Sequence, residues 1–202
     1  MKSIKFTQST ADLCIFIKTG GVNELVIVAV YVDDLIIVTK TPQNMADVLT
    51  QRFNMKNLGK LHHCLGMNPS PAPKYKKSDD GKLIGYSNAD WAGDYDNYHS
   101  TSGIIFTLSN GAVSWYSKKQ PVVALSTAEA EYNSPSTATQ ETIWLRRLLK
   151  DLNCCTTKDP TTIREDNQGA IATAKNPVHH SQTKHINMKY HYIREATQDK
   201  VI

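Results

Sequence analysis

The segment "TSGIIFTLSNGAVSWYSKK", residues 101–119, contains two apolar runs that flank an Asn-Gly pair. Both runs are rich in β-branched and aromatic residues, which predicts two strands. Asn110-Gly111 is the strongest short-range signal for a tight hairpin turn. The run "LIGYSNADW" at 83–91 comes before them and predicts a further strand. The segment therefore belongs to a predicted meander of three strands.

Helical patterns follow this meander. In "STAEAEYNSPSTATQETIWLRRLLKDL", Ser126 is the expected N-cap and Glu129 lies at the capping-box spacing. Pro135 lies inside the same predicted helix, where it removes a backbone hydrogen bond and costs about 3 kcal/mol. We expect a kinked helix or a marginal fold. "TTIREDNQGAIATAKN" then predicts a strand followed by a helix, and "TKHINMKYHYIREATQDK" a final amphipathic helix.

Residues 4–66 are predicted to form a separate unit. "AVYVDDLIIV" at 29–38 predicts two buried strands that meet at Asp33 and Asp34, and "PQNMADVLTQRFNM" predicts a helix that packs on this hairpin. Two adjacent carboxylates repel each other, so the pair is either a metal site or a plain polar turn. The stretch that follows, up to Lys82, carries three prolines and no apolar periodicity, which is typical of a linker.

Composition limits the classes of protein that remain. The 202 residues are 40% hydrophobic, which is enough for a packed core, and the net charge of +4 permits a nucleic-acid partner without requiring one. The four cysteines form no C-x-x-C pair, so reduced thiols are expected. The apolar run at 25–38 is too short to cross a bilayer. We expect no membrane segment and an intracellular location, in the cytoplasm or the nucleus.

The motifs resemble one known family. The "YVDD" box (Tyr31, Val32, Asp33, Asp34), followed by "FNMKNLGKLHHCLGM", resembles the reverse transcriptase of Ty1/copia-type retrotransposons. Six further motifs between residues 83 and 198 resemble the ribonuclease H domain of the same Pol polyprotein, in the same order: "GYSNADWAGD", "STSGIIF", "VSWYSKKQPVVALSTAEAEY", "IWLRRLL", "DNQGAIATAKNPVHH" and "TKHINMKYHYIRE".

The resemblance implies a fold class and a domain organisation. The fold is expected to be α/β, with a ribonuclease H-like mixed sheet and helices, preceded by a truncated reverse-transcriptase palm β-hairpin and helix. The expected parts are a reverse transcriptase segment at 1–67, a linker or deletion junction at 68–82, and a ribonuclease H-like domain at 83–202. Ancestrally such a protein copies RNA into DNA and degrades the RNA of an RNA–DNA hybrid.

In this family, the paired aspartates Asp33 and Asp34 hold catalytic Mg²⁺ or Mn²⁺ together with a third aspartate from an earlier strand. Two-metal chemistry needs such a cluster of anionic oxygen ligands. The chain is expected to begin too late to supply that third strand, since Asp12 precedes a different one. We therefore expect an inactive polymerase, in which the two aspartates survive as a turn.

The ribonuclease H site in the family uses four carboxylates, which match Asn88, Glu129, Asp166 and Asn187 of this chain. Two of these positions are amides, and an amide offers one neutral oxygen where a carboxylate offers two that share a charge. Glu129 and Asp166 are then expected to hold one ion weakly. We expect a nuclease that is inactive or severely weakened.

Three further residues are candidates with alternative interpretations. Asp90 shares a strand face with Asn88 but lies roughly 6.6 Å further along, so it becomes a ligand only if the motif register is shifted by two residues. Glu131 lies on a different helix face from Glu129 and is expected to be a solvated or hydrogen-bonded helix carboxylate. The resemblance assigns His185 a possible part in product release. The alternatives for the whole chain are a hybrid-binding module that does not cleave, a weak ribonuclease that uses Asp90, and a decayed reading frame without a stable product.

Overall fold

The computed structural model describes residues 4–20, 24–62, 81–154, 159–175 and 184–202, and gives only the backbone of 173 and 184–190. The chain divides into two compact units. The N-terminal unit comprises Met1–Ala72 with Arg147–Cys154, and the C-terminal unit comprises Pro73–Arg146 with Cys155–Ile202. The predicted linker at 68–82 lies outside the described residues except at its last two positions. None of the described helices is both long and apolar enough to span a membrane.

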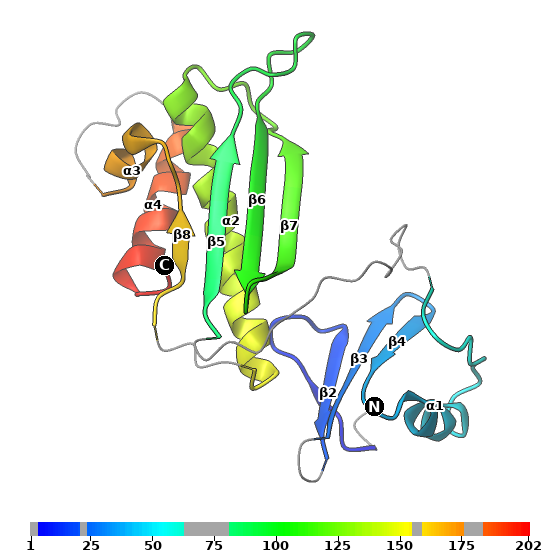
Figure 1. Ribbon diagram of the computed structural model, residues 1–202. Coiled ribbons are helices and arrows are strands. Elements are labelled where there is room, and N and C mark those ends of the chain that lie inside the picture. The colour runs from blue at the N-terminus through cyan, green and yellow to red at the C-terminus, as the bar shows by residue number, and fades with distance from the viewer. Residues whose placement is uncertain (1–3, 21–23, 63–80, 155–158, 176–183) are drawn as a thin grey trace. The chain divides into compact units, whose positions relative to one another are not determined.

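The N-terminal unit contains a four-stranded antiparallel sheet in the order β1-β2-β3-β4, followed by one helix (Figure 1). Its elements are β1 (Thr7–Gln8), β2 (Ile15–Thr19), β3 (Leu25–Tyr31), β4 (Asp34–Val38) and α1 (Pro42–Thr50). The predicted hairpin and helix are confirmed, although α1 ends at Thr50 and leaves Phe53 outside it, 42% exposed. Leu49 of α1 is fully buried with Val26 and Val28 of β3, so the helix packs on the hairpin as expected.

The C-terminal unit contains a mixed four-stranded sheet with helices (Figure 1). The strand order is β7-β6-β5-β8, and β8 is parallel to β5 whereas the other pairs are antiparallel. The predicted order of strands and helices is confirmed. The elements are β5 (Leu83–Ala89), β6 (Thr101–Leu108), β7 (Gly111–Lys119), α2 (Thr127–Asp151), β8 (Thr162–Arg164), α3 (Gln168–Lys175) and α4 (Lys184–Gln198).

The hairpin between β6 and β7 turns one residue earlier than predicted. Leu108 pairs with Gly111, so the turn residues are Ser109 and Asn110, with φ angles of 50° and 62°. Two consecutive positive φ angles are what a two-residue hairpin turn requires, and Asn tolerates this conformation well. Gly111 is instead the first, buried residue of β7.

Helix α2 begins as predicted and continues through Pro135. The Ser126 hydroxyl accepts a hydrogen bond from the backbone N–H of Glu129 at 3.2 Å, which confirms Ser126 as the N-cap. The helix is uninterrupted from Thr127 to Asp151, with Pro135 in its interior. Nearby Asn133 is buried, and its amide nitrogen donates to Gln120 at 2.8 Å. A buried polar side chain with a hydrogen-bond partner costs far less than an unpaired one.

The last residues of α2 belong to the N-terminal unit. The Asp151 carboxylate accepts hydrogen bonds from the Ser9 hydroxyl and from the backbone N–H of Thr10, both at 2.7 Å. These hydrogen bonds, of which the one from Ser9 has the largest effect, hold the pKa of Asp151 below its ordinary value. A carboxylate from residue 151 thus fixes the loop that follows β1.

Candidate functional site

Three carboxylates gather where α2 meets the end of β8. One oxygen of each of Glu131, Glu165 and Asp166 lies within 4.8 Å of the others. Glu131 and Glu165 are half-buried, and Asp166 is exposed. No other group of three or more His, Cys, Asp or Glu side chains gathers in this way within the described parts of the chain. We refer to these residues as the carboxylate cluster.

The segment after β8 holds Glu165 through both of its carboxylate oxygens. The Ser87 hydroxyl of β5 donates to Oε2 at 2.7 Å, and the backbone N–H of Asn167 donates to Oε1 at 3.2 Å. Asn167 in turn accepts a hydrogen bond from the backbone N–H of Ala170 at 3.0 Å, which caps the first turn of α3. The pairing of β8 with β5 and the start of α3 therefore fix this acidic segment.

Glu131 reaches the cluster from the second turn of α2. Its carboxylate accepts a hydrogen bond of 2.7 Å from the backbone N–H of Ala89, the last residue of β5. This bond joins the helix to the strand end. The cluster thus combines one helix residue with two residues that follow the parallel strand β8, next to β5.

The electrostatics of the cluster disfavour negative charge. Burial raises the pKa of Glu131, and repulsion from Glu165, Asp166 and Asp90 raises it further. The hydrogen bond from the Ala89 N–H acts in the opposite direction and lowers the pKa. Burial also raises the pKa of Glu165, partly offset by the hydrogen bonds from Ser87 and Asn167. Several like charges in a half-buried place repel each other, and a cation between them relieves that repulsion.

The donor set fits a divalent cation that prefers oxygen. Opposite ligands of Mg²⁺ lie about 4.2 Å apart and those of Ca²⁺ about 4.6 to 5.2 Å apart, from their metal–oxygen distances. The spacing of up to 4.8 Å in the cluster therefore suits such an ion after side-chain shifts of a fraction of an ångström. Glu131, Glu165 and Asp166 are the residues that would hold it.

Glu129, which the resemblance matches to the helix carboxylate of the family site, does not join the carboxylate cluster. Its carboxylate accepts a hydrogen bond from the backbone N–H of Leu125 at 2.8 Å and its side chain is exposed, so it completes the cap of α2 and lies outside the cluster. Two residues along a helix correspond to a rotation of about 200°, so Glu131 takes the opposite side and faces β5. The helix carboxylate of the cluster is Glu131.

The other predicted positions have different outcomes. Asp166 lies in the cluster, and its part as a metal ligand stays a prediction. Asn88 pairs with Gly103 in the sheet, and its side chain is exposed. Asn187 and His185 belong to the backbone of α4, but their side chains lie outside the described part of the structure.

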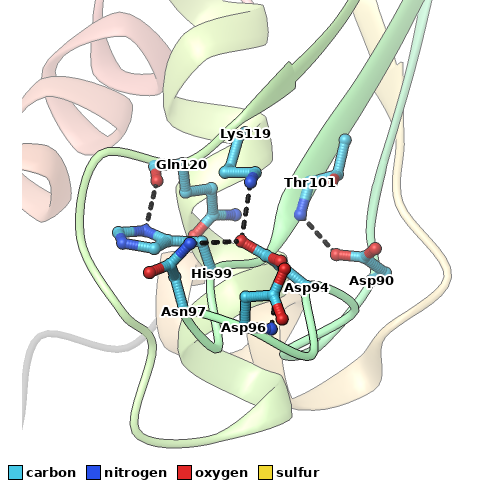
Figure 2. Close-up of polar contacts among 8 residues, drawn as sticks. All are labelled: Asp90, Asp94, Asp96, Asn97, His99, Thr101, Lys119 and Gln120. Carbon is cyan, nitrogen blue, oxygen red and sulfur yellow. Dashed lines mark hydrogen bonds and ion pairs between the residues drawn. The ribbon is translucent and has the colours of Figure 1, made fainter.

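Asp90 is engaged in the loop that joins β5 to β6. Figure 2 shows its carboxylate pointing to the backbone N–H of Thr101, which donates a hydrogen bond to it. A side chain at Gly93 would collide with the same carboxylate, so the loop closes tightly around it. Asp90 therefore acts as a loop residue here, although its charge still contributes to the raised pKa of Glu131.

Asp94 of the same loop forms an ion pair with Lys119, the last residue of β7, with 2.6 Å between the carboxylate oxygen and the ammonium nitrogen (Figure 2). The hydrogen bond from Lys119 is the main cause that lowers the pKa of Asp94. His99 lies beside the carbonyl of Gln120, with its Nδ1 at 2.7 Å. These contacts tie the loop to the end of β7 and to the residue that follows it.

The "YVDD" box forms a hairpin turn. Tyr31 pairs with Asp34, which leaves Val32 and Asp33 as the turn residues, and Val32 has a φ of 52° and is 82% exposed. Both aspartates are exposed, and the described residues bring no third carboxylate to them. This geometry favours the polar turn over the metal site.

Sequence reasoning did not single out Glu165, and it placed Glu131 away from the other candidate carboxylates. A signal for both existed. A carboxylate at the third position after an N-cap is used by the cap itself, so Glu131 was the helix carboxylate that remained available. Glu165 stands directly before Asp166 at the end of a predicted strand, where its side chain meets the neighbouring strand.

Comparison with known proteins adds the following. Residues 1–75 match the family model described as reverse transcriptase (RNA-dependent DNA polymerase). The chain is 47% identical over 118 residues to the Pol polyprotein from transposon TNT 1-94 of Nicotiana tabacum. The aligned region covers 58% of the chain and 9% of that protein. It is 41% and 45% identical to the Pol polyproteins from transposons RE1 and RE2 of Arabidopsis thaliana, over 72% and 61% of the chain.

These relatives are much longer than the chain, which spans 10% of the RE1 polyprotein and 8% of the RE2 polyprotein. Their names all denote retrovirus-related Pol polyproteins of transposons. Together with the family match, they identify the chain as a Ty1/copia-type retrotransposon Pol polyprotein sequence that carries a reverse transcriptase region.

Proposed function

We propose that residues 83–202 form a ribonuclease H-like domain that acted ancestrally on the RNA strand of RNA–DNA hybrids, and that this copy cleaves hybrids very slowly or not at all. The observation that carries the proposal is the carboxylate cluster beside the mixed sheet. The order of elements also agrees with what the resemblance implies. It consists of an antiparallel meander, a helix with a carboxylate near its start that faces the first strand, and a parallel fourth strand.

The chemistry of the site follows from its oxygen ligands. A bound Mg²⁺ or Mn²⁺ would supply charge stabilisation and an activated water for the hydrolysis of a phosphodiester. The residues of the chain hold and orient that ion: Glu131 is fixed by the N–H of Ala89, and Glu165 by Ser87 and Asn167. Asp166 is the exposed member of the cluster, on the side that a substrate can reach.

The weakness of the proposed nuclease comes from two amides. The resemblance matches Asn88, which precedes Ala89 at the end of β5, to one of the four carboxylates of the family site. A carboxylate at position 88 would add a negative charge at the end of β5, next to the residue whose N–H holds Glu131. At about 4 Å from a cation, one unit charge contributes roughly 4 kcal/mol per charge of the cation at an effective dielectric constant of 20. An amide at position 88, and a second at position 187, forgo this attraction.

The N-terminal unit is proposed to descend from the reverse transcriptase palm and to lack nucleotide addition by itself. Asp33 lies on the two-residue turn and Asp34 begins β4; both are exposed, without a third carboxylate beside them among the described residues. Since two-metal transfer needs a denser set of anionic oxygens, this pair alone is a poor metal site.

The test compares cleavage of an end-labelled RNA–DNA hybrid in Mg²⁺ and in Mn²⁺. The proteins are the parent chain, the Asn88→Asp/Asn187→Asp variant, and that variant with Glu131→Gln added. We expect cleavage by the double variant alone, since Glu131→Gln removes a proposed metal ligand. Comparable cleavage by the parent would contradict the proposed impairment. Absence of cleavage by every variant, with a folded protein by circular dichroism, would contradict the ribonuclease assignment.

A further inference from the structure

Four side chains form a row across the sheet of the C-terminal unit. Tyr86 of β5 pairs with Arg164 of β8 on one side and with Ile105 of β6 on the other, and Ile105 pairs with Trp115 of β7. Paired residues on neighbouring strands direct their side chains to the same face of a sheet. We call these four residues the aromatic row.

The aromatic row lies on the face of the sheet opposite α2. Ile104 and Phe106, the neighbours of Ile105 along β6, are 5% and 0% exposed on the other face, because successive side chains of a strand alternate. Figure 1 shows α2 passing behind β5, β6 and β7, and none of the described helices of this unit is drawn across their front. Ile105 and Trp115 are accordingly 40% and 63% exposed.

The chemistry of the row suits nucleic-acid bases. Tyr86 and Trp115 are separated by two strand spacings, about 9.6 Å, with the smaller Ile105 between them. The Arg164 guanidinium lies 5.5 Å from the centre of the Tyr86 ring, in the range of a cation–π contact. Aromatic rings beside a cation are groups on which unpaired bases stack, whatever their sequence. Here Trp115 is exposed and Tyr86 is half-buried.

The width of the row favours bases over a protein partner. The next row on the same face consists of Asn88, Gly103 and Ser117, which are polar or lack a side chain. The row on the other side contains Ile84 and Ala112 together with Thr107 and Thr162, so the apolar surface is a narrow strip interrupted by polar side chains. A stable protein interface buries about 800 Å² on each partner, which this strip cannot supply, whereas two stacked bases need only two rings.

We propose that the aromatic row is a stacking platform for single-stranded nucleic acid. The neighbouring row contains Asn88, so a strand on the platform passes about 7 Å from the residue that flanks the carboxylate cluster. Stacking needs neither a metal ion nor a hybrid. The platform is thus a binding surface distinct from the proposed ribonuclease site. It binds a single strand with unpaired bases and does not bind a duplex.

The test measures binding of a fluorescein-labelled 12-nucleotide single strand by anisotropy, with EDTA present so that the cluster holds no metal. The variants are Trp115→Ala, Tyr86→Ala, the conservative Trp115→Phe, and Trp91→Ala as control. Trp91 is 52% exposed but lies in the loop after β5, where its ring N–H donates to the carbonyl of Ala124. We expect each of the first two variants to weaken binding at least about fivefold, the lower end for loss of one stacked base.

Trp115→Phe and Trp91→Ala should bind within about twofold of the parent. Three results would each overturn the proposed platform. They are unchanged binding by Trp115→Ala and Tyr86→Ala, equal losses of affinity in Trp115→Ala and Trp91→Ala, and no binding by the parent. Self-association of the parent that Trp115→Ala abolishes would assign the face to a protein contact instead. Hybrid cleavage by the Asn88→Asp/Asn187→Asp variant is a separate readout, so a failure here leaves the proposed nuclease standing.

Discussion

The carboxylate of Glu131 in α2 accepts a 2.7 Å hydrogen bond from the backbone N–H of Ala89, at the end of β5. This contact orients a half-buried acid toward two others, Glu165 and Asp166, without supplying a positive charge to balance them. An N–H group stabilises one carboxylate, but it cannot neutralise the repulsion among three. The cluster is therefore poised to gain stability from a cation, and its members differ in how they respond to pH and to substitution.

Divalent ions should stabilise the chain through Glu131 and not through Glu129. An ion that binds only the folded state adds about 2.7 kcal/mol to the free energy of unfolding at 100 times its dissociation constant. We expect Mn²⁺ to raise the melting temperature of the parent and of Glu129→Gln, and to have little effect on Glu131→Gln. Thermal unfolding at constant ionic strength measures this. An equal rise in all three proteins would show that the cluster is not the binding site.

The raised pKa values of Glu131 and Glu165 predict the pH dependence of stability in the absence of metal. A carboxyl group with a folded-state pKa above its unfolded value of about 4.3 contributes stability below that value and loses it as pH rises through the folded pKa. Glu165→Gln cannot ionise, so it removes this loss of stability with rising pH. Its amide oxygen can still accept the hydrogen bond from the Ser87 hydroxyl. We therefore expect the variant to gain stability relative to the parent as pH rises.

This gain should stay below about 1 kcal/mol, because the group is partly exposed and solvent screens it. Urea unfolding between pH 4 and 7 in EDTA measures the difference between the two proteins, which cancels contributions from other groups such as Asp151. A difference that is constant with pH, or that falls as pH rises, would contradict the assigned repulsion.

Sequence predicted the larger elements of both units because their signals are local. The apolar runs of β3, β4 and β6 and the N-cap of α2 fix the type of each element without any knowledge of the rest of the fold. Strand β1 was missed because it has only two residues and exists through pairing with β2. The turn before β7 moved by one residue because the cross-strand register decided it, and a sequence pattern does not encode that register.

The site was less predictable than the fold, for a physical reason. Whether Glu129 or Glu131 reaches the cluster depends on which of them the helix cap uses, and that is a matter of hydrogen-bond geometry in the first turn. The place of Glu165 depends on Ser87, a residue 78 positions away in the sequence. Asp166 was predicted because the resemblance matches it to a carboxylate of the family site.

Asp151 should stabilise the N-terminal unit through its contacts with the loop after β1. Asp151→Ala removes the acceptor for Ser9 and for the backbone N–H of Thr10. We expect a loss of about 1 kcal/mol in the free energy of unfolding, since hydrogen bonds to a charged group contribute more than neutral ones but this group is largely exposed. Because the pKa of Asp151 is lowered, the contribution is present above its unfolded pKa and is lost as pH falls through the folded value.

Urea unfolding at pH 7 and at pH 3 measures the contribution of Asp151. Asp199→Ala, which removes an exposed carboxylate from the C-terminal unit, is the matched control and should have little effect at either pH. Equal stability of the parent and Asp151→Ala at pH 7 would show that the loop does not depend on this acceptor.

Pro135 should limit the stability of the C-terminal unit. It lies in the interior of α2, has no N–H to donate, and costs about 3 kcal/mol relative to alanine in such a position. Its ring also lines a cavity of about 680 Å³, together with Tyr132 and Ile193, so Pro135→Ala loses some packing. We expect a net gain of about 1 to 2 kcal/mol, because the helix penalty exceeds the transfer free energy of the two or so methylene groups removed.

The midpoint of urea unfolding measures this gain, and Gln140→Ala is the matched control. Gln140 is exposed on the same helix, and its replacement changes helix propensity by only a few tenths of a kcal/mol. If Pro135→Ala is neutral or destabilising while Gln140→Ala behaves as expected, the pyrrolidine ring contributes more to the packing of α2 against α4 than it costs the helix. The proposed weakness of the nuclease would then rest on the two amides at positions 88 and 187, since α2 would carry no penalty.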